Sequence, residues 1–171
     1  MNSEKVLVVF YSRTGTTRRA ASALAAMLDA DVEEIIVTRG RLGPFGYLRS
    51  LVEAVNRKPA EIVAPKRDPS AYDLVVIGSP VWAGCVSSPV RAYLEANWRR
   101  LPHVACFCSF AQRSAESALA QMRMLARKSP LAECHVTPRE TLHGQASTIL
   151  AAFAERAARK LAESVALTAT R

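Results

Sequence analysis

The chain has 171 residues, half of them hydrophobic, which is enough for one domain with a sizeable core, and we expect a single domain over residues 1–171. No apolar run approaches the length that crosses a bilayer, so no membrane span is expected, and the apolar run near the N-terminus lacks a signal-peptide cleavage site. The net charge is +8, but lysine and arginine are scattered and no basic stripe carries interleaved aromatics, which argues against a nucleic-acid partner.

Apolar, strand-like runs alternate with segments of helical period, which is the pattern of a parallel sheet covered by helices on both faces. The first half of the chain predicts a strand at 5–11, a helix at 16–28 and a short, half-charged strand at 31–37. The connection that follows is too long for a simple loop, so we expect an extra helical segment within about 39–72, with its helix at 44–56.

The third strand, 74–78, is the most apolar and is expected at the centre of the sheet. Ser88 and Pro89 then start a helix that runs to about residue 98, because serine can cap the first amides and proline suits the first helical position. The remaining predicted elements are strands at 103–109 and 132–136, helices at 114–127 and 145–163, and a frayed tail at 164–171.

Three loops follow the carboxyl ends of the strands, where open α/β sheets bind ligands: 12–17, 79–87 and 109–113. The first, SRTGTT, combines hydroxyl groups, one glycine and a helix N-terminus, which suits a single terminal phosphate. It lacks the GxxxxGK[ST] and GxGxxG patterns of the best-known nucleotide loops. By itself it fits a phosphate cradle and a simple helix cap equally well.

The second loop, GSPVWAG, is expected to expose Trp82 at its tip. A tryptophan there either anchors the core or an interface, or stacks on a flat cofactor. Beside a phosphate loop, we favour the flat cofactor.

The segments YSRTGTT, GSPVWAG and SSPVRAYL resemble the flavodoxin family, especially its bacterial flavodoxin-like and NAD(P)H:quinone or FMN reductase-like members. The resemblance implies an α/β, flavodoxin-like three-layer sandwich, with a five-stranded parallel sheet of order 2-1-3-4-5 and helices on both faces. It also implies the cofactor FMN, with the backbone near Ala83 and Gly84 facing the flavin N5. The implied cofactor-binding residues are Ser12, Arg13, Thr14, Gly15, Thr16, Thr17, Ser79, Pro80, Val81, Trp82, Ala83, Gly84, Ser109, Phe110, Ala111, Gln112 and Arg113.

The expected function is that of an NAD(P)H-dependent oxidoreductase that reduces a quinone or similar acceptor. The positive net charge attracts the phosphates of NAD(P)H, whereas electron-carrying flavodoxins are typically acidic and dock on basic partners. One alternative is an electron carrier without NAD(P)H activity that serves a redox protein partner. A second is a non-catalytic flavodoxin-fold module that binds an acidic partner through the basic segment 39–67, although a solvated basic face explains that segment more simply. A homodimer is left open.

No side chain is assigned a catalytic or metal-binding role. The four cysteines lack zinc spacing and are expected to be buried free thiols of a cytoplasmic protein, including Cys85 beside the second loop. His103 and His135 are expected to be structural, and His143 lies in a loop with no visible partner. Tyr47 is interpreted as a packed surface aromatic, with a wall of the site as the alternative.

Overall fold

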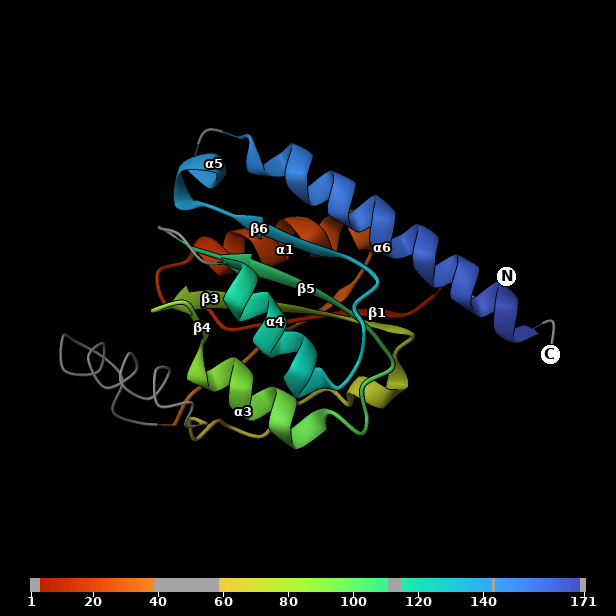
Figure 1. The fold of residues 1–171 in the computed structure, drawn as a ribbon, viewed down its shortest axis with the longest axis horizontal. Coiled ribbons are helices and arrows are strands. Elements are labelled where there is room, and N and C mark those ends of the chain that lie inside the picture. The colour runs from red at the N-terminus through yellow and green to blue at the C-terminus, as the bar shows by residue number, and fades with distance from the viewer. Residues whose placement is uncertain (1–3, 39–58, 111–114, 143, 170–171) are drawn as a thin grey trace.

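The computed structural model describes residues 4–38, 59–110, 115–142 and 144–169, and it forms three layers, with a sheet between two layers of helices (Figure 1). The parallel strands are β1 (Val6–Phe10), β2 (Asp31–Glu34), β3 (Leu74–Trp82), β5 (His103–Ser109) and β6 (Glu133–Val136). Their order is β2-β1-β3-β5-β6, which confirms the predicted order 2-1-3-4-5 and puts the most apolar strand at the centre.

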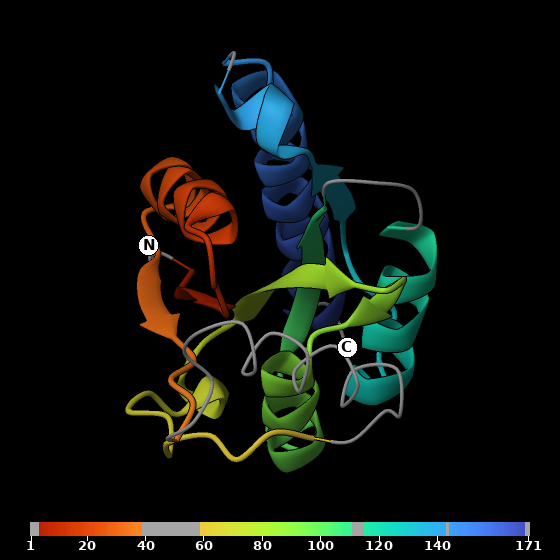
Figure 2. The ribbon, with the colours of Figure 1, turned by 90° about the vertical axis from the view of Figure 1, so that its left-hand side faces the viewer.

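Four longer helices cover the sheet: α1 (Thr16–Leu28), α3 (Ser88–Asn97), α4 (Ala115–Ala126) and α6 (Ala146–Ala169). α1 and α6 lie on one face and α3 and α4 on the other, as Figures 1 and 2 show from two sides. A short helix α5 (Pro138–Leu142), which the sequence did not predict, precedes α6, and a single 3-10 turn, η1 (Pro69–Ala71), precedes β3. No helix in the described ranges is long and apolar enough to cross a membrane.

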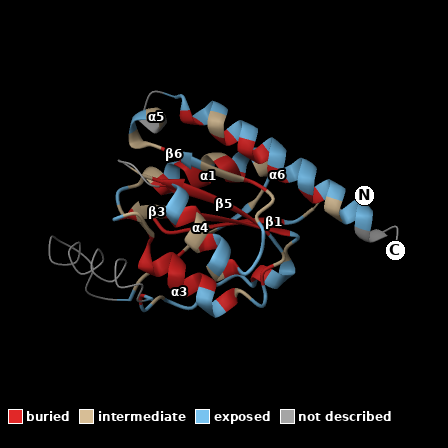
Figure 3. Cartoon of the chain, viewed as in Figure 1, coloured by how far each residue is buried: buried red, intermediate tan, exposed pale blue. Residues whose placement is uncertain are grey.

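Successive side chains of each central strand enter two separate cores. In β1, Leu7 and Val9 join the cluster under α3 and α4, whereas Val8 and Phe10 join the cluster under α1 and α6. All five residues of β1 are buried, because both faces of a parallel sheet are covered. Figure 3 shows the central strands as buried, α3 as buried over most of its length, and α6 as buried only on part of its surface.

Four details of the prediction are wrong. The strand predicted at 74–78 continues to Trp82 and pairs antiparallel with β4 (Cys85–Val86), so most of the predicted loop 79–87 is a β-hairpin. α3 begins at Ser88, as predicted, but its N-cap residue is Ser87 and no serine side chain caps the helix there. Residues 164–169, predicted as a tail outside the last helix, are helical and continue α6. The strands predicted at 5–11, 31–37 and 132–136 are shorter.

The helix predicted at 44–56, with Tyr47, and most of the basic segment lie outside the described residues.

Gly78 is required where β3 passes β5. It lies opposite Phe107 in the register, and a Cβ at this position would overlap the Phe107 ring. Phe107 is fully buried, so the ring has no free space into which it can turn.

Replacing Gly78 by alanine should therefore lower the free energy of unfolding by about 1–3 kcal/mol through overpacking. Chemical denaturation measures this loss. A G78A/F107L double variant should lose less free energy of unfolding than the sum of the losses of the two single variants, since leucine leaves room for the new methyl group. Strict additivity would show that the ring is not the cause.

Candidate functional site

The first predicted loop joins β1 to α1 and presents the N-terminus of α1. Gly15 takes the N-cap position with φ of 92°, in the left-handed region, and no side chain caps the helix there. The Gly15 N–H donates to Ser12 Oγ at 3.1 Å, and a Cβ built on Gly15 would find no heavy atom within 4 Å. The space at this helix end is open, and the first amides of a helix have no intrahelical acceptor. The loop can therefore hold an anion.

Two of the four hydroxyl groups of this loop already have partners within the protein. Ser12 is buried and accepts the Gly15 amide, and buried Thr17 shares a hydrogen bond of 2.7 Å with Ser109. Thr14 is exposed and Thr16 is half-buried. The Thr17–Ser109 bond ties the first predicted loop to the third.

The second predicted loop is the hairpin of β3 and β4, which crosses the centre of Figure 2. Trp82, predicted to be exposed, is only 8% exposed and meets the Tyr11 ring edge-on, with 5.7 Å between the ring centroids. Tyr11 directly precedes Ser12, so Trp82 lies at the base of the first loop. The two loops are neighbours, but Trp82 is an internal wall and not an exposed tip.

The tip of the hairpin consists of Ala83 and Gly84, both with positive φ, 48° and 74°. Ala83 is exposed, and an alanine held in the left-handed region costs about 1 kcal/mol. Such strain is often found at functional sites. The turn thus presents backbone groups, not a large side chain, at the edge of the sheet.

A polar chain supports this turn from behind. Arg91 of α3, only 5% exposed, donates from Nη2 to Gln121 Oε1 of α4 at 2.9 Å. Gln121 Nε2 in turn donates to the Gly84 carbonyl at 3.5 Å and to Ser117 Oγ at 3.3 Å. The sequence did not point to Arg91 or Gln121, because nothing in their helical spacing distinguishes them from other polar residues.

Replacing Gln121 by leucine should loosen the hairpin. One hydrogen bond contributes about 1 kcal/mol, so amide exchange at Cys85 and Val86 should become roughly fivefold faster. Hydrogen exchange measured by NMR tests this. Ser117→Ala, which removes only the other acceptor of Gln121, is the control and should leave these rates unchanged. Equal rates in all three proteins would show that Gln121 does not hold the turn.

Ser79 stabilises the hairpin through hydrogen bonds from its buried hydroxyl group. It is fully buried, its Oγ accepts the Ser87 N–H at 3.1 Å, and the two hydroxyl groups lie 3.0 Å apart. The Ser87 hydroxyl does not cap α3 because it lies against the Ser79 hydroxyl. Pro80 and Val81 are half-buried within β3. Of the predicted second-loop residues, Ala83 and Gly84 are therefore the ones at the tip.

The third predicted loop begins at Ser109 and Phe110, and Ala111, Gln112 and Arg113 lie outside the described residues. The Phe110 ring meets His135 edge-on, with 5.2 Å between the centroids. His135 is exposed.

The cysteines are free thiols, as predicted, but only Cys106 and Cys108 are fully buried. Cys85 and Cys134 are half-buried, which corrects the prediction for these two. Burial raises the pKa of the Cys106 and Cys108 thiols and raises that of Cys134 to about 12, so these groups stay protonated and unreactive near neutral pH. The described part of the chain contains no cluster of His, Cys, Asp and Glu that could hold a metal ion, and His143 lies outside it.

Comparison with known families explains this arrangement. A family model described as Flavodoxin matches residues 5–137. The chain belongs to the flavodoxin family. The match includes the first helix and the β3–β4 hairpin, and it ends just after β6. No curated protein matches the chain significantly.

Solved structures share the fold of this flavodoxin. A flavoprotein from Lactobacillus acidophilus, solved in complex with FMN, is 23% identical, with a TM-score of 0.68 over 82% of this chain and 97% of its own. A putative flavoprotein from Bacteroides eggerthii is 23% identical, with a TM-score of 0.65 over 85% and 98%. A WrbA-like flavodoxin from Agrobacterium tumefaciens is 18% identical, with a TM-score of 0.58 over 92% and 99%.

Proposed function

We propose that this flavodoxin binds FMN at the carboxyl ends of β1, β3 and β5 and works as an NAD(P)H-dependent oxidoreductase that reduces a quinone or a similar acceptor. The observation that carries the proposal is the meeting of two features at one edge of the sheet. The open N-terminus of α1 at Gly15 suits a phosphate, and the Tyr11–Trp82 pair beside it suits an aromatic ring. The flavoprotein from Lactobacillus acidophilus with the same fold was solved with FMN, which supports the same choice of ligand.

The first loop would hold the phosphate group of FMN. The amides at the start of α1 and the hydroxyls of exposed Thr14 and half-buried Thr16 can all donate to phosphate oxygens. Thr17 and Ser12 act indirectly, because their hydroxyl groups fix the loop through Ser109 and the Gly15 amide. Arg13, half-buried in the same loop, adds a positive charge.

The hairpin would border the flavin ring. Trp82, buried against Tyr11, would form an aromatic wall of the ring site, and the turn at Ala83 and Gly84 would supply backbone groups that can hydrogen-bond the flavin ring. Gln121 would hold the Gly84 carbonyl in place. When bound, FMN supplies the hydride and single-electron transfer, and the protein supplies binding, orientation and exclusion of water.

The net charge of +8 supports NAD(P)H as the electron donor, because a positive protein attracts its phosphates. We expect purified protein loaded with FMN to oxidise NADH or NADPH with quinone acceptors faster than the same concentration of free FMN. Steady-state assays with both donors and a panel of quinones measure this.

Two other outcomes would replace the enzyme proposal. A protein that binds FMN and passes electrons to cytochrome c after chemical reduction, but does not oxidise NAD(P)H, is an electron carrier. A protein that takes up no FMN at all is a binding module of the same fold.

A further inference from the structure

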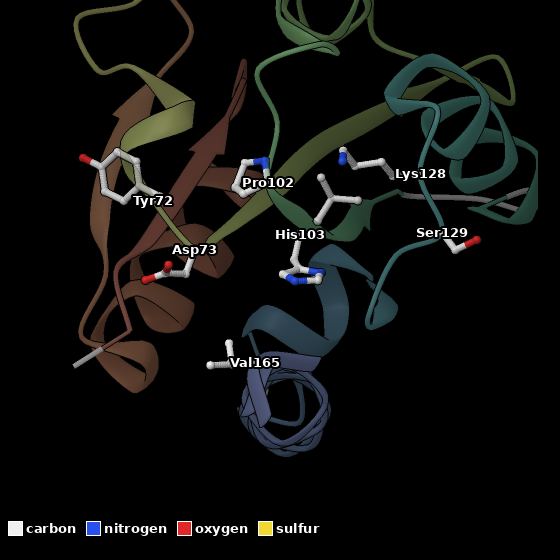
Figure 4. Close-up of a pocket in the computed structure, with 8 residues that line it drawn as sticks. Tyr72, Asp73, Pro102, His103, Lys128, Ser129 and Val165 are labelled. Atoms are coloured by element: carbon white, nitrogen blue, oxygen red, sulfur yellow. The ribbon is translucent and has the colours of Figure 1, made fainter. Parts of the chain in front are cut away.

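A cavity lies at the edge of the sheet opposite the proposed flavin site, at the amino ends of β3 and β5. Its volume is about 760 Å³, within the usual range of small-molecule sites. Asp73 and His103, at the starts of these strands, line it together with Pro102, Lys128, Ser129 and Val165 (Figure 4).

The continued end of α6 forms one wall of this cavity. Val165 lies in the part of the chain that was expected to fray, and the helix places it across from His103 and Lys128. The segment after α4 forms the other side, with Lys128 and Ser129. The cavity therefore depends on the last turns of α6.

Two cationic or protonatable side chains face this space with no partner in the described residues. Lys128 and His103 are both exposed, and the Lys128 amino group is directed towards Pro102 across the cavity (Figure 4). Lys128 therefore makes one side of the cavity electropositive, and the His103 ring beside it can hydrogen-bond a ligand.

The other walls limit which anion fits. Asp73 is negative and accepts the Lys5 N–H at 2.7 Å, so it disfavours a second negative charge at that end. Val165 and Pro102 present apolar surface. A ligand with one negative charge and an apolar body fits both the Lys128 side and the apolar walls of the cavity.

We propose that this cavity binds a small organic monocarboxylate, with the carboxylate at Lys128 and His103 and the apolar body against Val165 and Pro102. The site is separate from the flavin site, so binding does not require FMN. The competing explanation is that Lys128, two residues past the end of α4, only complements the helix dipole.

The test uses 2-naphthoate as the probe and the full chain, with and without FMN. We expect saturable NMR shift changes at His103, Lys128 and Val165, with a dissociation constant below about 1 mM. 2-Naphthylmethanol, which has a similar shape but no charge, should bind at least about tenfold more weakly. No saturable shift, or equal binding of the alcohol, would overturn the proposal.

Matched variants test whether Lys128 contacts the probe directly. Lys128→Ala should weaken 2-naphthoate binding at least about tenfold, whereas Lys160→Ala, an equal loss of charge on exposed α6 surface, should change it less than twofold. Val165→Asp, at a position 45% exposed, should abolish binding without unfolding the protein. Equal weakening by Lys128→Ala and Lys160→Ala would mean that only the overall charge attracts the probe, and the site would be rejected.

Discussion

Replacing Gly15 by valine should weaken FMN binding at least about tenfold. Gly15 has a φ of 92°, and a β-branched residue in the left-handed region costs of order 1–2 kcal/mol, so the loop will rearrange and turn the α1 amides away from the phosphate. Titration of the unloaded protein with FMN, followed by flavin fluorescence, gives the dissociation constant.

The chain provides a matched control at Gly144. This glycine also has a positive φ, 75°, and a Cβ there would meet nothing within 4 Å, but it lies before α6 and outside the flavin site. Gly144→Val should therefore lose similar stability and keep its FMN affinity. If both variants bind FMN like the parent protein, the first loop does not hold the phosphate.

Replacing Trp82 by alanine should have the largest effect on both stability and FMN binding. Only 8% of Trp82 is exposed. Removal of such a large buried aromatic group lowers the free energy of unfolding by about 3–5 kcal/mol. The Tyr11 ring would lose its partner, and the base of the first loop would lose its support. Thermal unfolding and FMN titration measure the two effects.

Trp82→Phe separates the effect on stability from the effect on FMN binding. It keeps an aromatic side chain against Tyr11 and should keep most of the stability, yet it should still weaken FMN binding because the ring surface is smaller. Trp98→Phe, at the far end of α3, is the control and should not change FMN affinity. Unchanged affinity in Trp82→Phe and Trp82→Ala would remove Trp82 from the site.

The parts of the fold that depend on local pattern were predictable. α1 has the predicted bounds, because its apolar face repeats at helical spacing and a glycine marks its start. The order of the strands came from the family resemblance and not from spacing.

The hairpin was missed because Ser79 and Pro80 have the composition of a loop. Proline is tolerated at this point in β3 because β1 pairs with β3 only as far as Gly78. Beyond Gly78, β1 offers no carbonyl acceptor that a backbone N–H at position 80 would need. The turn also lacks the usual Asn-Gly pair and uses Ala83 and Gly84. The burial of Trp82 follows from this hairpin, so it could not be predicted before the hairpin was known.

The end of α6 was missed for a different reason. The segment from 146 to 171 contains no glycine or proline to stop a helix, and Ser164 Oγ donates to the Lys160 carbonyl within it. Nearness to the chain end had suggested fraying. Tertiary structure also decided the pairing of Thr17 with Ser109, 92 residues apart, which no local pattern could show.

The central claim is that the first loop and Trp82 belong to one FMN site. The chain has two tryptophans, so Trp98→Phe leaves Trp82 as the single tryptophan. Titrating this variant with FMN should quench the Trp82 emission, and the quenching should saturate at one FMN per chain. Saturable FMN binding that leaves Trp82 emission unchanged, or no binding at all, would contradict the account.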